Sequence, residues 1–266
     1  MGSTQQGHTD VPSVKRALLG GSLGLLAAYL LILTAFIWST ADSTQAPYFD
    51  LDGGFAKTAY WITESGGPYG AAIVGMTMLV VFVTRPGVKR RRRECFMLAC
   101  AVGLCAGLGA ACNEYVIKEY FQRPRPNIVS LLDSHQRAVE LHSLTRSQSS
   151  GRLSEVLAQN DGAIALSPAI KAHWIETTGY SFPSGHSFSA MFFATFFLML
   201  GLTCVSKKRR WCFYALVPWA VAVCYSRTIL RVHSPADISA GALQGIVLGM
   251  IGFAVTVRLL QRSWSG

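Results

Sequence analysis

Charged residues are scarce in this chain of 266 residues. Asp, Glu, Lys and Arg together make up 14% of the sequence, whereas soluble domains usually carry about 25%. This shortage argues against an ordinary soluble enzyme. Apolar residues make up 51%, which excludes an intrinsically disordered chain. Because these residues occur in long uncharged runs, the composition predicts an integral membrane protein.

The sequence also lacks the patterns that hold disulfides or metals. It has seven cysteines, an odd number, and no Cys-x-x-Cys pair. It contains no aspartate-rich metal motif and no His-x-His pair, and too few acids lie near its basic clusters for a Mg²⁺ cage. We therefore expect no metal site, no cofactor and no disulfide framework, and we interpret the cysteines as small packing residues.

Six uncharged runs predict six membrane-spanning helices, since a helix needs roughly 20 apolar residues to cross the hydrocarbon core. The runs are 17–41, 65–84, 95–113, 187–206, 211–226 and 238–257, of which the fifth is the shortest. The first exceeds the apolar core of a signal peptide, so we interpret it as a retained anchor. The expected fold is an all-α integral membrane protein with a single domain over 1–266.

Basic residues concentrate on one side of this predicted bundle. That side holds Lys15, Arg16, Arg85, residues 89–93, residues 207–210, Arg258 and Arg262, with Asp10 and Glu94 as its only acids. Positively charged loops stay in the cytoplasm, so both termini are expected there. This topology explains the net charge of +10 without nucleic-acid binding.

The segment 119–180 is then an extracytoplasmic insertion between the third and fourth spans. Its composition predicts a mixture of helical and irregular structure, with a turn-rich stretch at 147–151 and a short helix at 153–158. A connection of this length in a compact protein is usually functional.

Glycines at a spacing of four residues mark two spans. Gly241, Gly245 and Gly249 lie in the last span, and Gly103 and Gly107 in the third. Small residues at this spacing let helices approach closely. We expect packing within the chain rather than dimerisation.

The first of three polar clusters follows the third span. Lys118, Arg123 and Arg125 lie within eight residues, interrupted by Pro124 and followed by Pro126. Each proline favours extended backbone in the residue before it, which would project the arginines. Cations at a span end commonly anchor a helix at the interface. Anchoring and anion binding are therefore both open for this segment taken alone.

The second cluster, residues 182–187, precedes the fourth span. Gly185 gives the backbone freedom, and the N-terminus of the following helix offers unpaired N–H groups to an anion. Ser184 adds a hydroxyl donor, and His186 can carry a proton near neutral pH. An ordinary helix start beside an interfacial histidine fits the same residues.

The third cluster, residues 226–237, joins the last two spans. Ser234 suits an N-cap and Pro235 the first helical position. Asp237 follows His233 by four residues, which brings its carboxylate within reach of the imidazole. A carboxylate that accepts one ring N–H leaves the other nitrogen as a nucleophile. Asp237 also suits a helix start for purely structural reasons.

Taken together, the clusters offer cations, neutral donors, two imidazoles and a carboxylate on one membrane face. Phosphoryl transfer mainly needs charge-stabilising donors around the phosphate oxygens and an in-line nucleophile. The set therefore predicts metal-free phosphoryl transfer. His135, His142 and His173 are scattered through the insertion, and we expect surface roles for them.

At these residues the sequence resembles the type 2 phosphatidic acid phosphatase superfamily, which also includes vanadium haloperoxidases and some soluble acid phosphatases. Its three-part signature is present as Lys118…Arg125-Pro126, Pro183-Ser184-Gly185-His186 and Ser226-Arg227…His233…Asp237. The resemblance covers about residues 95–257. The stretch 173–186, the long insertion and residues 61–64 are most similar to the bacterial phosphatidylglycerophosphatase B branch.

The resemblance implies a role for each matching residue. His233 would attack phosphorus and form a phosphohistidine, Asp237 would orient it, and His186 would protonate the leaving oxygen and later activate water. The phosphate would be held by Lys118, Arg125, Ser184, Gly185 and Arg227. Arg123, Arg231 and Glu176 lie outside the signature and are candidates for headgroup contact.

The function expected is hydrolysis of a lipid phosphate at the outer face of a bacterial inner membrane. Phosphatidylglycerophosphate is the favoured substrate, with undecaprenyl diphosphate second and phosphatidic acid third. A lipid phosphotransferase using the same histidine remains an alternative. A transporter would carry charges near mid-membrane, which these spans lack, and haloperoxidase-like chemistry has no need of six spans. The expected partners are the lipid substrate and membrane lipids, and the oligomeric state is left open.

Overall fold

The computed structural model describes residues 11–41, 50–88, 91–160 and 164–265, and the side chains of 18–34, 50–88, 91–160 and 164–261. These residues form helices and one isolated bridge, between Leu51 and Leu166, but no strand. The α-helices are α1 (Val11–Ala41), α2 (Gly54–Gly66), α3 (Pro68–Val83), α4 (Arg91–Cys112), α5 (Lys118–Phe121), α6 (Pro126–Leu132), α7 (His135–His142), α8 (Arg146–Gln159), α9 (Pro168–Glu176), α10 (Gly185–Cys204), α11 (Trp211–Tyr214), α12 (Leu216–Ile229) and α13 (Pro235–Ser265). A π-helix, η1 (Asn113–Ile117), joins α4 to α5, and a 3₁₀ turn, η2 (Lys207–Arg209), precedes α11.

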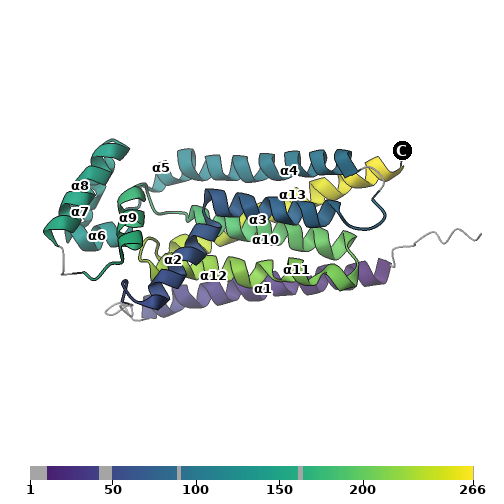
Figure 1. The fold of residues 1–266 in the computed structure, drawn as a ribbon, viewed down its shortest axis with the longest axis horizontal. Coiled ribbons are helices and arrows are strands. Elements are labelled where there is room, and N and C mark those ends of the chain that lie inside the picture. The colour runs from purple at the N-terminus through teal and green to yellow at the C-terminus, as the bar shows by residue number, and fades with distance from the viewer. Residues whose placement is uncertain (1–10, 42–49, 89–90, 161–163, 266) are drawn as a thin grey trace, which may run out of the picture.

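The long helices run side by side around α10 (Figure 1). Residues 187–202 of α10 are all buried, except Ser189, and the helix packs on α13, α12, α1 and α3. Its phenylalanines form a continuous stack, in which the rings of Phe192 and Phe196 lie 6.0 Å apart and those of Phe193 and Phe197 lie 6.2 Å apart. A helix that is apolar on all sides belongs at the centre of a membrane bundle.

Among the residues that the structure describes, four helices are long and apolar enough to cross a membrane: Arg91–Phe121, Gly185–Cys204, Trp211–Ile229 and Pro235–Gln261. The pair α2 and α3, bent by 62°, adds a fifth if it is counted as one span. The bend falls where Gly67 is extended and Pro68 begins α3, because proline cannot continue the hydrogen-bond ladder of α2. The described apolar part of α1, Leu18–Thr34, is shorter. An all-helical membrane protein is thus confirmed, whereas the number six stays a prediction.

The insertion is more helical than predicted. It forms α6 to α9, which lie at one end of the bundle (Figure 1). The expected turn at 147–151 is wrong, because these residues belong to α8. Thr145 caps this helix and Gln148 returns the bond in a capping box. Leu153 and Leu157, buried on the same helix, hold α8 in a small core of the insertion.

The segments rich in basic residues share the opposite end of the bundle. The α3–α4 and α10–α11 connections lie there, as do the start of α1 and the end of α13 (Figure 1). Arg85 and Glu94 form a buried ion pair of 2.7 Å at this end. The described residues do not include 1–10, 89–90 or 266, nor the side chains of Lys15, Arg16 and Arg262, so the topology signals on them lie outside what the structure describes.

The glycine stripe of α13 packs inside the chain, as predicted. A Cβ on Gly241 would collide with the carbonyl oxygen of Ser184, and one on Gly245 with that of Phe188. These glycines therefore bring α13 against the backbone of α10. The prediction is wrong for Gly103 and Gly107, where an added Cβ would meet nothing within 4 Å.

Replacing Gly241 with alanine is expected to lower the free energy of unfolding by about 1–3 kcal/mol, because the new methyl group must push α10 away from α13. The shift also moves Ser184 relative to Asp237, so activity should fall with stability. Gly103→Ala is the matched control, which should leave activity unchanged and should not lower stability, because its methyl group meets nothing within 4 Å. Thermal unfolding in detergent measures the effect, and equal stability of the two variants would contradict the packing argument.

Candidate active site

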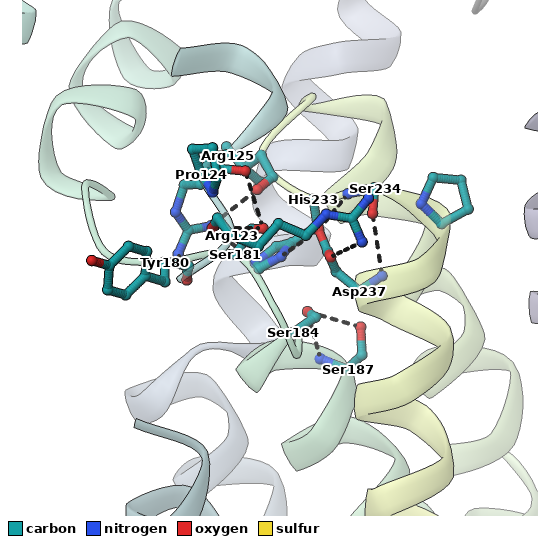
Figure 2. A network of polar contacts seen from close by, with 12 residues as sticks. Arg123, Pro124, Arg125, Tyr180, Ser181, Ser184, Ser187, His233, Ser234 and Asp237 are labelled. Atoms are coloured by element: carbon teal, nitrogen blue, oxygen red, sulfur yellow. Dashed lines mark hydrogen bonds and ion pairs between the residues drawn. The ribbon is translucent and has the colours of Figure 1, made fainter. Parts of the chain in front are cut away.

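Backbone hydrogen bonds tie the three predicted clusters together at the insertion end of the bundle. They run from Ser181 N to Arg123 O (2.8 Å), from Ser184 N to Asp237 O (3.0 Å) and from Asn127 N to Arg231 O (2.9 Å). Segments separated by more than fifty residues of sequence are thereby fixed to one another. Figure 2 shows their side chains converging beside the starts of α10 and α13.

Each of these two helix starts is capped by a serine. Ser184 precedes α10, and its hydroxyl oxygen accepts hydrogen bonds from the backbone N–H (3.3 Å) and the hydroxyl (3.0 Å) of Ser187. At the start of α13, Asp237 Oδ2 accepts from Ser234 N (2.7 Å), while Ser234 Oγ accepts from Asp237 N (3.3 Å). These reciprocal bonds hold the Asp237 carboxylate in place without the help of a ligand.

His233 lies between a guanidinium and a carboxylate (Figure 2). Its Nε2 is 3.0 Å from Arg125 Nη1, and its Nδ1 is 3.6 Å from Asp237 Oδ2. Arginine can only donate, so Nε2 accepts and the ring proton resides on Nδ1, facing the carboxylate. This is the tautomer in which Nε2 can act as a nucleophile.

Arg125 is held by backbone carbonyls. Its guanidinium donates to the carbonyl oxygens of Gly179 (2.7 Å), Val232 (3.0 Å) and Tyr180 (3.4 Å). Burial lowers the pKa of Arg125 to about 10, which leaves it a cation at neutral pH. Burial, with Arg125 and Arg227 nearby, lowers the pKa of His233 well below its ordinary value. The imidazole is therefore neutral at neutral pH, as nucleophilic attack requires.

Arg227 is fully buried in the last turn of α12. The sequence placed it in the loop after the fifth span, but α12 continues to Ile229. Its Nη1 contacts His173 Nε2 at 3.1 Å. Within the described part of the chain its Nε and Nη2 have no hydrogen-bond partner. Two unpaired donors on a buried cation are costly unless an anion binds them.

Lys118 and His186 complete the predicted set. Lys118 follows the π-helix η1, is 8% exposed and pairs with Glu114 at 2.5 Å. Lys118 lies close enough to Arg125 and Arg227 for their positive charges to act on its ammonium group. His186 is the second residue of α10, and it lies close enough to Arg227 and His233 to interact with them electrostatically. Every predicted site residue thus lies at this end of the bundle, with Gly185 as the first residue of α10.

Other residues were misassigned or missed by the sequence. The surface role predicted for His173 is wrong, since its side chain is 10% exposed and lies between Glu64 and Arg227. His142 is also half-buried, stacked on Tyr180 with ring centroids 4.4 Å apart. His135 is exposed, as expected. Arg123 Nη1 is 3.4 Å from Asp237 Oδ1, a contact that the spacing of the residues did not suggest.

The charge of the site suits an anion. Among the residues that the structure describes, no group of three or more His, Cys, Asp or Glu side chains is arranged to hold a metal ion. Its cations are Arg125, Arg227, Lys118 and the half-exposed Arg123, and they outnumber the contacting carboxylates of Asp237 and Glu114. Cationic donors around a neutral imidazole are the arrangement that phosphoryl transfer to a histidine requires.

Residues 95–261 match the PAP2 superfamily, and the chain belongs to this family. It is 28% identical to phosphatidylglycerophosphatase B of Escherichia coli K12 over 232 residues, covering 86% of this chain and 84% of that protein. It is 27% identical to phosphatidylglycerophosphatase B of Haemophilus influenzae, covering 87% and 94%. A shorter match of 84 residues, 33% identical, covers 32% of this chain and 35% of the lipid A 4'-phosphatase of Bacteroides thetaiotaomicron.

Proposed function

We propose that this protein hydrolyses a lipid phosphate through a phosphohistidine intermediate on His233. The observation that carries the proposal is the setting of His233. Its Nε2 accepts from Arg125, its Nδ1 faces Asp237, and the unpaired donors of the buried Arg227 belong to the same site. The membership of the chain in a phosphatase family supports the same reaction.

The reaction follows from the positions of these groups. The Nε2 lone pair of His233 forms a bond to phosphorus as the bond from phosphorus to the leaving oxygen breaks. His186 gives its proton to that oxygen, and Asp237 stabilises the positive charge on the His233 ring. A water molecule, deprotonated by His186, then attacks phosphorus and releases inorganic phosphate. Arg125, Arg227, Lys118 and the start of α10 (Ser184 and Gly185) stabilise the phosphate oxygens throughout.

The proposed setting is the inner membrane of a bacterium, with six spans, both termini in the cytoplasm and the site facing the periplasm. The spans are α1, the bent pair α2 and α3, α4 to α5, α10, α11 to α12, and α13. Exposed aromatic rings at the site end support a position of the site at a membrane surface, among them Trp61 (70%), Tyr69 (88%), Tyr115 (78%) and Tyr120 (82%). Such rings are enriched where a bilayer meets water. A lipid there keeps its chains in hydrocarbon while its phosphate reaches the cations.

Phosphatidylglycerophosphate is the proposed substrate. Two relatives that align over most of their length are phosphatidylglycerophosphatases B. The half-exposed Arg123, ion-paired to Asp237, adds a cation beside the site. A cation there suits a lipid that carries a second phosphate in addition to the scissile one. Undecaprenyl diphosphate shares that feature and is the second candidate.

The test is phosphate release by the purified protein in detergent, with no acceptor lipid added. Phosphatidylglycerophosphate, undecaprenyl diphosphate and phosphatidic acid form the panel, and the highest kcat/KM is expected for the first. Release without an acceptor distinguishes a phosphatase from a phosphotransferase. If no inorganic phosphate is released and the phosphoryl group appears instead on an added acceptor lipid, the transferase alternative is correct.

Chelation is expected to leave activity nearly unchanged, because Lys118, Arg125 and Arg227 supply the positive charge that a metal ion would otherwise supply. The measurement compares the initial rate of phosphate release before and after dialysis against EDTA. A rate within about twofold of the untreated enzyme is the expected result. Complete loss that Mg²⁺ restores would contradict the metal-free mechanism.

A further inference from the structure

A second carboxylate–imidazole pair lies behind Arg227, on helices that contribute none of the three clusters. Glu64 comes from α2 and His173 from α9. His173 Nδ1 is 3.4 Å from Glu64 Oε1, and its Nε2 is 3.1 Å from Arg227 Nη1. We propose that Glu64 and His173 are positioning residues that hold the Arg227 guanidinium in its phosphate-binding orientation. This inference rests on the proposed function, since it assigns a phosphate to Arg227.

The direction of the two contacts follows from hydrogen-bonding capacity. The Arg227 guanidinium has only N–H groups, so Nε2 of His173 must accept. A neutral imidazole then carries its proton on Nδ1, and that N–H points toward the Glu64 carboxylate. Glu64 thereby selects the tautomer that can receive Arg227. The other tautomer would set two donors against each other.

The surroundings of His173 keep it a neutral acceptor. Its side chain is 10% exposed, and the Tyr60 ring packs against it in a T-shaped contact with centroids 5.9 Å apart. Burial, followed by the charges of Arg227 and Arg125, lowers the pKa of His173 to about 3. Trp174 fixes α9 to the third cluster by donating from Nε1 to Leu230 O at 2.9 Å.

A neutral acceptor for Arg227 has a different effect from that of a carboxylate in direct contact. It takes the Nη1 hydrogen bond without cancelling the positive charge. The remaining donors, Nε and Nη2, lie on one edge of the guanidinium and have no partner within the described residues. Two parallel donors on one edge are the geometry with which arginine binds phosphate. Holding Nη1 therefore orients that edge while the full charge remains for the ligand.

The experiment compares two substitutions at His173. His173→Phe keeps an aromatic ring beside Tyr60 but removes the acceptor, whereas His173→Gln keeps an acceptor oxygen. We expect His173→Phe to lower kcat/KM for phosphate release by about ten- to a hundredfold, the range for losing a hydrogen bond to a charged group. It should weaken competitive inhibition by inorganic phosphate. His173→Gln should recover most of both losses, which a purely structural role would not allow.

Glu64 provides an independent variant, because its side chain is 45% exposed and tolerates substitution more readily. Glu64→Leu removes the acceptor of the Nδ1 proton and is expected to lower kcat/KM about tenfold. Glu64→Gln keeps an oxygen for that proton and should stay within about threefold of the wild type. If His173→Phe fails to fold, as judged by thermal unfolding in detergent, the Glu64 pair decides the question.

The matched control is His135→Phe, the same change at an exposed histidine of the insertion, which should leave kcat/KM unchanged. Replacing Arg227 with alanine supplies the second control. In that background His173→Phe should cause no further loss, because its effect passes through Arg227. A full further loss there, no rescue by glutamine, or an active His173→Phe and Glu64→Leu pair would overturn the inference. A wild-type protein that releases no phosphate contradicts instead the proposed function.

Discussion

Replacing His233 with alanine is expected to lower phosphate release by about 10⁴-fold or more, the scale on which removal of an enzyme nucleophile acts. His233 is 3% exposed, and its Nε2 contacts Arg125 at 3.0 Å. His173 is also a neutral imidazole between a cation and a carboxylate, but its Nε2 is engaged by Arg227 and it lies outside the three clusters. The acid-labile phosphoenzyme should disappear together with turnover.

The measurement combines steady-state phosphate release with acid quenching after mixing enzyme and labelled substrate. His135→Ala serves as the control, because His135 is exposed on α7 and should keep both signals. Thermal unfolding in detergent shows whether the His233 variant is folded. A folded His233→Ala protein that keeps more than a tenth of the wild-type rate, or still forms the phosphoenzyme, would show that the nucleophile lies elsewhere.

The membrane helices were predictable from sequence because a helix in lipid pairs its own backbone groups, so a span appears as a continuous uncharged run. The runs 95–113 and 187–206 indeed lie within α4 and α10, apart from the last residue of the first, which begins η1, and the last two residues of the second. The bend between α2 and α3 was missed, although Gly67 and Pro68 carry its signal. A hydropathy average over many residues does not detect such a break, although the helix axis bends there.

The insertion shows how local composition misleads. Serines and a glycine at 147–151 suggested turns, but the helix is set by the capping box at Thr145 and Gln148 and by the burial of Leu153 and Leu157. The cap is readable from the sequence once the helix start is considered. The burial is not, because it depends on how α8 packs against α9 and α6.

The candidate site also contains some contacts that local spacing predicts and others that depend on how distant helices pack. His233 and Asp237 are four residues apart, so their contact could be expected from spacing alone. The pairing of His173 with Arg227 joins residues 54 positions apart and depends on the docking of α9 beside α2. One local signal existed, since His173 lies three residues after the buried Ile170 and therefore faces the same side of α9.

Replacing His186 with alanine is expected to slow turnover of a lipid phosphate by about 10²- to 10⁴-fold, the range of general acid catalysis. His186 lies in the first turn of α10 beside the site, near Arg227 and His233. An alkoxide leaves phosphorus slowly unless a proton reaches it, whereas nitrophenolate leaves without one. The variant should therefore form the phosphoenzyme far faster from nitrophenyl phosphate than from the lipid.

The same variant separates the two half-reactions, because His186 is also proposed to activate water. With nitrophenyl phosphate, His186→Ala should give a burst of nitrophenol equal to the enzyme concentration, followed by slow release of phosphate. The phosphoenzyme then accumulates to a level that the wild type does not reach. His135→Ala should show neither the burst nor the accumulation. Equal slowing with both substrates, without a burst, would instead indicate that His186 binds the phosphate in both half-reactions and transfers no proton.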